Sequence, residues 1–108
     1  MTRQATDQTD LGRFEEPAIL ILTSLLEGPR WGYAIVKDVE AVSGVHLGPG
    51  TLYATLARLE ARGLIEGLPS ADRRRPYRIT GAGLDLVRGR LERMRAVAHA
   101  GLTRLAGA

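Results

Sequence analysis

Apolar side chains recur at helical spacing in three segments of the first half of the chain. The first predicted helix begins at Pro17, since proline suits a first helical position, and Gly28 with Pro29 ends it. The second runs from residue 31 or 32 to residue 43, and the third from Pro49 to Gly63. The apolar positions of the three helices are Ala18–Leu22 with Leu25 and Leu26, then Ile35, Val36, Val39 and Val42, and finally Leu52, Leu56 and Leu59. The first helix is apolar nearly all round, which indicates burial on several sides.

Two short segments after the third helix have the pattern of β-strands. Leu64–Leu68 and Pro76–Thr80 are bounded by turn residues, and in the second of them Tyr77 and Ile79 alternate with polar neighbours. A polar stretch, residues 69–75, joins the two segments and ends in three consecutive arginines. The two segments therefore predict a β-hairpin with a basic tip.

A long amphipathic helix is predicted after the hairpin. Thr80 is a good N-cap, and the helix extends to about Leu105, which is roughly 38 Å at about 1.5 Å per residue. The positions that follow a seven-residue repeat are Leu84, Val87, Leu91, Met94, Ala98 and Leu105, and Leu102 lies close to it. Gly101 interrupts this seam near its far end.

The order helix, helix, helix, strand, strand, helix predicts a mainly α fold with a small β-hairpin. It is the order of a winged helix-turn-helix followed by a long C-terminal helix. Residues 1–13 are too polar to fold alone and are expected to form a flexible extension. Residues 14–80 are expected to form the winged helix-turn-helix domain, and residues 81–108 the C-terminal dimerisation helix.

The last helix needs a partner, because a small three-helix core cannot cover its whole length. An uncovered seam would be an unusually large apolar stripe in water. Pairing with the same helix of a second copy covers the stripe, so we expect a homodimer with the seam as its interface. The alternative is that the helix folds back on its own domain.

Positive charge gathers in the second half of the chain, although the net charge is only +3. Fourteen of the 15 basic residues are arginine, a side chain suited to phosphate and guanine contacts. Arg73, Arg74 and Arg75 at the hairpin tip can reach phosphates, and each such contact releases counterions. The alternatives are a genome-wide codon bias and arginines that merely solubilise a loop. We expect double-stranded DNA as the partner.

The third helix is expected to enter the major groove with its N-terminal residues toward the bases. Tyr53 is expected to contact a phosphate or a sugar, with half-burial against the second helix as the alternative. Thr51 has two open interpretations, a helix cap and a phosphate contact. For Arg58, a phosphate or base contact competes with a pair to Glu60 on a solvated face.

Trp31 and Tyr33 flank Gly32 at the start of the second helix. Their expected role is core packing against the first helix. The alternative is a phosphate contact by Tyr33 or the stacking of a ligand on Trp31.

Several classes of protein are not expected. The chain has no cysteine, so a disulfide scaffold, a thiol nucleophile and a cysteine zinc site are excluded. His46 and His99 lie in different elements and no acidic cluster has ligand spacing, so we expect neither catalysis nor a metal or other cofactor. No apolar run reaches the roughly 18–20 residues that span a bilayer, and the N-terminus lacks a signal peptide's apolar segment. A cytoplasmic protein without membrane contact is the expectation.

Several runs of residues resemble PadR-type transcriptional regulators. They are Ile19–Leu22 through Leu26–Ile35, then Leu47–Glu60 with Gly63–Ile65 after it, and Arg74–Gly83 at the second strand and the start of the last helix. The resemblance covers residues 17–92. It implies a bacterial or archaeal repressor that is dimeric through its C-terminal helix and often released from DNA by a small molecule. By motif position it implies the DNA-contacting residues Tyr33, Pro49, Gly50, Thr51 and Tyr53 together with the wing arginines.

Two positions depart from this family's pattern. Gly48 stands where a serine is usual, which removes a hydroxyl that can cap the helix or contact phosphate. Ala54 stands where a proline is common, which leaves a small apolar surface that could meet a thymine methyl. Some compact relatives stack flat aromatic ligands on a tryptophan of the last helix. Residues 81–108 contain no aromatic side chain, so this ligand mode is not expected here.

The sequence therefore predicts a regulator, by family expectation a repressor, that binds an inverted-repeat operator as a homodimer. The alternative is a winged helix used only for protein contacts, against which the arginine wing argues. A further hypothesis places a small-molecule effector near the dimer seam. An adaptable methionine beside small residues motivates it, and the expected lining is Phe14, Leu91, Met94 and Ala98.

Overall fold

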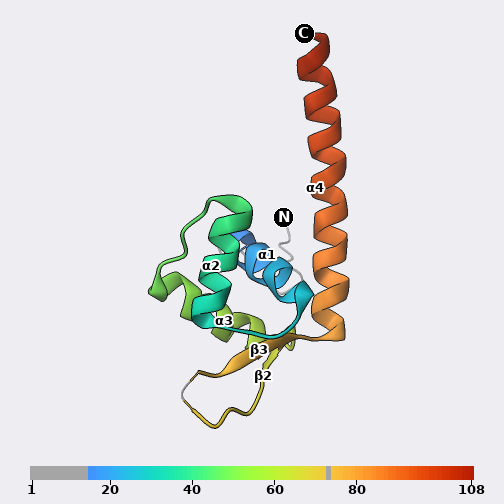
Figure 1. Ribbon diagram of the computed structural model, residues 1–108. Helices are drawn as coiled ribbons and strands as arrows, with labels where there is room; N and C mark the ends of the chain where they lie inside the picture. The colour runs from blue at the N-terminus through green and yellow to red at the C-terminus, as the bar shows by residue number, and fades with distance from the viewer. Residues whose placement is uncertain (1–14, 73) are drawn as a thin grey trace, which may run out of the picture.

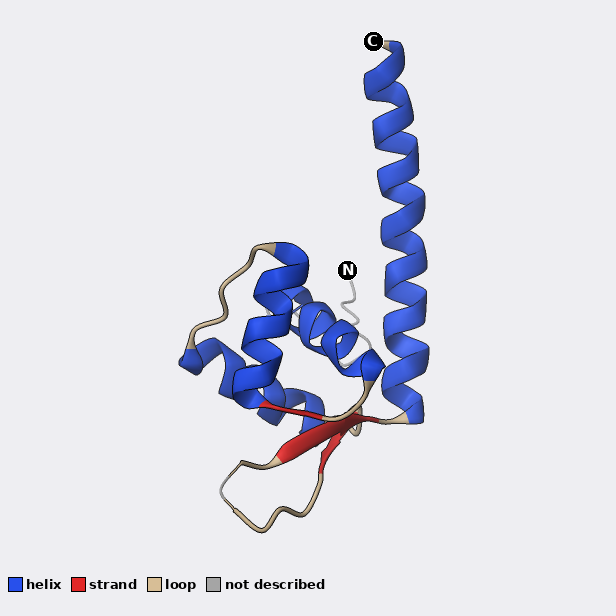
Figure 2. Cartoon of the chain, in the orientation of Figure 1, coloured by secondary structure: helices blue, strands red, loops and turns tan. Residues whose placement is uncertain are grey.

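Helices and a small sheet make up the fold in the computed structural model, which describes residues 15–72 and 74–108 (Figure 1). The helices are α1 (Glu15–Ser24), the 3-10 turn η2 (Leu25–Glu27), α2 (Gly32–Ser43), α3 (Pro49–Ala61) and α4 (Gly81–Gly107). The strands are β1 (Arg30–Trp31), β2 (Ile65–Gly67) and β3 (Pro76–Ile79). This confirms the mainly helical fold with a small β-hairpin that the sequence predicts (Figure 2).

The core lies where α1, α2 and α3 meet the sheet and the first turns of α4. α1 is buried on several sides, as its apolar composition predicts. The helices α2, α3 and α4 and the strand β2 each contribute at least one buried side chain, and Tyr77 and Ile79 of β3 pack against this core. The buried apolar residues are Ala18, Ile19, Ile21, Leu22, Leu25, Ile35, Val39, Leu47, Leu52, Leu56, Leu59, Leu64, Ile65 and Val87.

The helix ends follow local sequence signals. Gly44 ends α2 in the left-handed conformation, with φ of 77°, and its N–H donates to the Glu40 carbonyl at 2.8 Å. Thr80 is the N-cap of α4, and its hydroxyl accepts from the Gly83 N–H at 3.1 Å. The described part of α1 already includes Glu15 and Glu16, before the predicted start at Pro17, since proline is tolerated in a first helical turn, where its missing N–H has no intrahelical partner.

The sheet has the antiparallel order β1-β3-β2, so the predicted hairpin carries a third strand. β2 pairs with β3 with Gly67 opposite Tyr77, and β1 pairs with β3 with Trp31 opposite Pro76. β1 has two residues, which is too short for any period to show in the sequence. Because β1 pairs with β3 and directly precedes α2, it connects the wing to the start of that helix.

α4 leaves the sheet edge and projects beyond the rest of the molecule (Figure 1). Its first half packs on α1, where Val87 is 1% exposed and Arg90 forms an ion pair with Glu15. Its second half extends without covering the core, and the exposed fraction of Leu105 reaches 73%. The fold-back alternative therefore describes only the first half of this helix.

Candidate nucleic-acid interface

α3 presents its N-terminal turn outward because its apolar stripe holds the opposite side in the core. Leu52, Thr55, Leu56 and Leu59 are buried, while Thr51, Tyr53, Ala54, Ala57 and Arg58 are exposed. The exposed residues of the predicted DNA-contacting set on this helix are Pro49, Gly50, Thr51, Tyr53, Ala54 and Arg58. A helix surface with small and hydroxyl side chains at its N-terminal end suits close approach to base edges.

The N-terminus of α3 has Gly48 at its N-cap and no side-chain cap. Thr51 lies inside the first turn, so its interpretation as a helix cap is wrong. Its carbonyl accepts a hydrogen bond from the Thr55 hydroxyl at 2.6 Å, and the residue itself is exposed. An uncapped first turn presents backbone N–H groups that can donate to a phosphate.

Tyr33 and Tyr53 frame a groove between α2 and α3. The exposed fractions of the two residues are 57% and 56%. A Cβ at Gly32 would lie 2.9 Å from the Tyr53 hydroxyl, so the glycine allows that ring to lie against the start of α2. The groove has a volume of about 300 Å³, and its lining consists of Tyr33, Val36, His46, Leu47, Pro49, Leu52 and Tyr53.

Two neighbouring rings with a cation at each end connect α2 to the wing. The Trp31 and Tyr33 ring centres are 5.6 Å apart, Lys37 Nζ lies 5.8 Å from the Tyr33 ring centre, and Arg74 Cζ lies 4.7 Å from that of Trp31. The expectation that Trp31 and Tyr33 pack in the core is therefore wrong. Trp31 is half-buried in β1, which holds it next to the wing, and Tyr33 is exposed in the first turn of α2.

The tip of the wing is built around Asp72. Its Oδ1 accepts from the Arg74 N–H at 2.8 Å and from the Ser70 hydroxyl at 3.0 Å. These two hydrogen bonds, the backbone one first, hold the pKa of the Asp72 carboxyl below its ordinary value. The turn places Arg74 at the outer end of the hairpin, whereas Arg73 of the predicted set lies outside the described residues.

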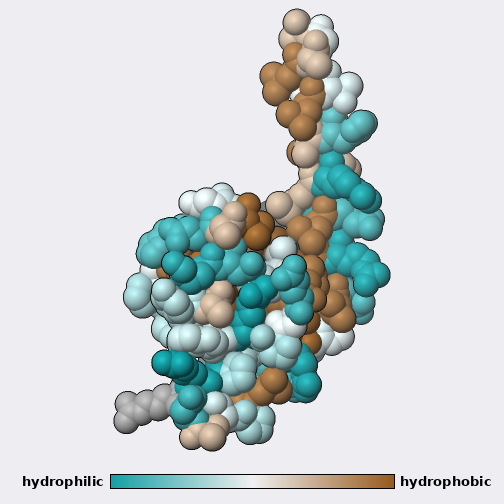
Figure 3. Space-filling view, viewed as in Figure 1, coloured by the Kyte–Doolittle hydropathy of each residue, from teal (hydrophilic) through white to brown (hydrophobic). Residues whose placement is uncertain are grey.

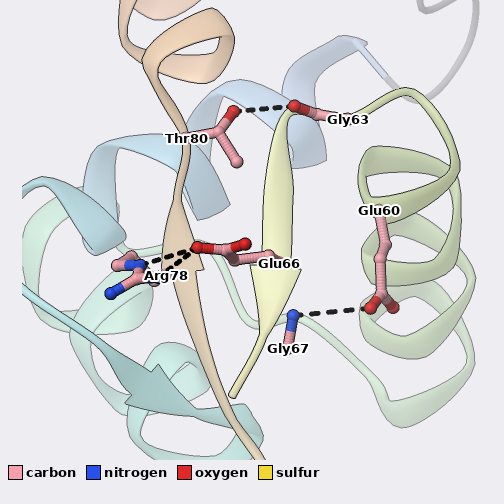
Figure 4. Close-up of polar contacts among 6 residues, drawn as sticks. All are labelled: Glu60, Gly63, Glu66, Gly67, Arg78 and Thr80. Atoms are coloured by element: carbon pink, nitrogen blue, oxygen red, sulfur yellow. Dashed lines mark hydrogen bonds and ion pairs between the residues drawn. The ribbon is translucent and has the colours of Figure 1, made fainter.

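Two carboxylates pair with arginines at the base of the wing. Glu66 of β2 pairs with Arg78 of β3 across the sheet, and Glu60 of α3 accepts from Gly67 (Figure 4). Arg75 also donates to Glu60, at 2.9 Å. Glu60 therefore pairs with a wing arginine, a contact that no local pattern predicts because the partners are 15 residues apart in the chain.

The predicted dimer seam divides along α4. Met94, Leu102 and Leu105 are 55%, 66% and 73% exposed, Leu84 is 37% exposed, and Ala98 is exposed as well. Leu91 is half-buried. The prediction that Val87 lies in the dimer seam is wrong, because Val87 is 1% exposed and belongs to the core of its own chain. Figure 3 shows apolar side chains along α4 up to its C-terminal end.

The residues expected to line an effector cavity do not come together as a set. A groove of about 320 Å³ lies between η2 and α4, lined by Leu26, Leu84, Val87, Arg88, Leu91, Glu92 and Arg95. Leu91 belongs to this lining, whereas Met94 and Ala98 lie outside it. Phe14 lies outside the described residues.

Two kinds of feature are absent from residues 15–72 and 74–108. No three His, Asp or Glu side chains are grouped so as to hold a metal ion. None of the helices there has the length and apolar character needed to cross a membrane.

Comparison with known proteins places this architecture in a family. Residues 21–88 match the family described as transcriptional regulator PadR-like. A PadR family transcription regulator from Clostridium difficile is similar with a TM-score of 0.74 and 28% identity, covering 87% of this chain and 99% of that one. A transcriptional regulator from Clostridium thermocellum has a TM-score of 0.69 and 30% identity, covering 77% and 86%. A PadR family regulator from Eggerthella lenta has a TM-score of 0.67 and 33% identity, covering 85% and 82%.

One sequence relative is much longer than this chain. An uncharacterized 37.1 kDa protein in transposon Tn4556 of Streptomyces fradiae is 47% identical over 75 residues. The match covers 69% of this chain and 22% of that protein. The family match and the structural matches together are decisive, since they include the helix-turn-helix and the wing. The chain belongs to the PadR-like family of transcriptional regulators.

Proposed function

We propose that this protein represses transcription by binding an inverted-repeat operator in double-stranded DNA as a homodimer. α3 enters the major groove, and the wing lies on the flanking backbone. The observation that supports this most directly is the continuity of one surface. It runs from the exposed N-terminal turn of α3 through Tyr53 and Tyr33 to Trp31 and Arg74.

The proposed contacts divide by chemistry. Thr51, Tyr53 and Tyr33 offer hydroxyls to phosphate oxygens, and the uncapped first turn of α3 offers backbone N–H groups. Ala54 is exposed and can meet a thymine methyl. The full proposed set in the described residues is Tyr33, Pro49, Gly50, Thr51, Tyr53, Ala54, Arg58 and Arg74.

The homodimer follows from the uncovered apolar side of α4. A second copy of α4 covers Met94, Leu102 and Leu105, which are all more than half exposed in one chain. Two-fold symmetry then places two copies of α3 about 34–36 Å apart, or a multiple of it, along the duplex. In this division residues 14–80 contact DNA and residues 81–108 hold the dimer together.

Release by a small molecule is the regulation that we propose for this dimer. The groove lined by Leu26, Leu84 and Leu91 lies beside the seam, so a ligand there can shift the two subunits relative to each other. Thermal-shift screening against aromatic acids and cationic drugs tests this part. Stabilisation that disappears in Leu91→Asp is the expected result, and a screen without any stabilising compound contradicts it.

The test of DNA binding is its dependence on salt. Fluorescence anisotropy with a random-sequence duplex at about 50 and 200 mM salt should show measurable affinity that falls steeply, because phosphate contacts release counterions. Footprinting of the DNA beside the coding gene should then reveal a protected inverted repeat. Absent or salt-independent binding would favour the alternative, a winged helix that contacts only proteins.

A further inference from the structure

Glu60 contacts both legs of the wing from the last turn of α3. Its Oε2 accepts from the Arg75 Nη2 at 2.9 Å and from the Gly67 N–H at 3.4 Å. Gly67 is the last residue of β2, and Arg75 immediately precedes β3. One carboxylate of the helix proposed to enter the groove therefore joins both strands of the hairpin proposed to lie on the backbone (Figure 4 shows the Gly67 contact).

Gly67 provides the space for this arrangement. A Cβ built there would overlap the Arg75 guanidinium at Cζ, Nε and Nη2. Arg75 Cζ also lies 5.6 Å from the Tyr77 ring centre, and Tyr77 is opposite Gly67 in the sheet. The guanidinium thus lies over the glycine with a carboxylate and a ring as neighbours, and it turns back toward α3.

Arg74 differs from Arg75 in what its side chain contacts. The Arg74 guanidinium lies over Trp31, and the nearby Asp72 carboxylate accepts from the Arg74 backbone N–H. Arg75 is 52% exposed and engaged with Glu60. The two adjacent arginines of the wing therefore have different side-chain contacts, Arg74 with an aromatic ring and Arg75 with a carboxylate.

We propose that Arg75 is a positioning residue, which through Glu60 and Gly67 fixes the angle between the wing and α3, and that it does not neutralise a phosphate. This rests on the proposed DNA binding and reassigns one arginine of the predicted contact set. The wing and α3 must contact the duplex together, so a hairpin free to swing loses affinity without losing a phosphate contact.

Glu60→Gln gives the sharpest test, because the two explanations predict opposite signs. Removing a negative charge beside DNA should tighten binding if only electrostatics matters. Loss of the Arg75 partner should instead weaken binding to a random duplex, by about two- to fivefold per subunit. Gly67→Ala, which changes no charge, should weaken it similarly. Glu66→Gln is the matched control, since it removes the same charge and an arginine partner within the hairpin alone.

The salt dependence separates Arg75 from Arg74. Each lost phosphate contact lowers the slope of log K against log salt by about 0.9. Arg74→Gln should lower the slope in this way, whereas Arg75→Gln should weaken binding with the slope unchanged. An equal fall in slope for both variants would overturn the positioning role, as would tighter binding by Glu60→Gln.

A measurement without DNA tests the same contact independently. The chain has no cysteine, so spin labels at Ala57→Cys on α3 and Ala71→Cys at the wing report one distance, with unlabelled protein in excess. We expect Glu60→Gln and Gly67→Ala to broaden the distance distribution and Glu66→Gln to leave it narrow. Unchanged distributions would overturn the inference. If the wild-type protein does not bind DNA, the proposed function is overturned instead. The distance distribution would still decide whether Glu60 fixes the position of the wing relative to α3.

Discussion

The guanidinium of Arg74 lies over the indole ring of Trp31, with Cζ 4.7 Å from the ring centre. The contact joins the outer end of the wing to β1, which enters the sheet through its pairing with β3. Trp31 is the only tryptophan of the sequence, so its fluorescence reports on this one contact.

Addition of duplex DNA should change the Trp31 emission, because a phosphate competes with the ring for Arg74. In Arg74→Gln we expect a different emission before DNA is added and a smaller change afterwards. Arg78→Gln is the control, since Arg78 pairs with Glu66. A DNA-dependent change of the same size in Arg74→Gln would show that Arg74 does not move to the phosphate.

Substitution of two glycines in α4 should have opposite effects on stability. A Cβ at Gly83 would overlap the Leu64 carbonyl oxygen, so Gly83→Ala should lower the free energy of unfolding by about 1–3 kcal/mol. A Cβ at Gly89 meets nothing within 4 Å, so Gly89→Ala should raise it by up to about 1 kcal/mol. Urea unfolding at one fixed protein concentration measures both. Equal gains would mean that α4 is not held against Leu64.

Two valines of α4 test where the helix leaves the core. Val87 is 1% exposed and Val97 is 72% exposed. Val87→Ala should cost about 2 kcal/mol of unfolding free energy, because two buried carbon groups are lost. Val97→Ala should change it by less than about 0.5 kcal/mol. Similar losses at both positions would contradict the burial pattern.

Leu102→Glu tests the proposed dimer. A charge on the exposed apolar side of α4 should raise the dimer dissociation constant about tenfold or more, since the Leu102 side chains of both subunits are no longer buried at the interface. Thr103→Glu is the control, because adjacent helical positions face different directions. Sedimentation at several concentrations gives the result. Wild-type sedimentation of Leu102→Glu would remove this side of α4 from the interface.

Acid should loosen the wing tip through Asp72. Hydrogen bonds from the Arg74 N–H and then from Ser70 lower its pKa from the ordinary 3.8, so their stabilisation is complete above 3.8. It is lost as the pH falls through the lower pKa of the folded state. The Arg74 amide chemical shift should therefore titrate with a midpoint below 3.8 and lose this transition in Asp72→Asn. A midpoint at or above 3.8 would contradict the turn geometry.

The helices of this protein could be predicted closely because their signals are local. Pro49 lies at the start of α3, Gly44 at the end of α2 and Thr80 at the cap of α4, as expected from the sequence. Caps and apolar stripes act within a few residues, so the neighbouring sequence contains them.

The candidate site could be predicted in part. The exposed positions of α3 follow from its apolar stripe, and Tyr53 is exposed for this reason. Trp31 was expected in the core, and this was wrong. Its position depends on β1, and the strand that pairs with β1 lies beyond α3 in the chain, so no local pattern reveals it. Arg75 could not be distinguished from Arg74 by sequence, since three adjacent arginines look alike.

The chain alone determined the order of the elements, their ends and the arginines at the hairpin tip, since these depend on residues close to one another. Only the folded chain decided that Val87 turns into the core, that Trp31 lies beside Arg74 and that Glu60 holds the base of the wing. Such contacts join segments separated by long stretches of chain, and packing in three dimensions selects them from many pairings that the sequence permits equally well.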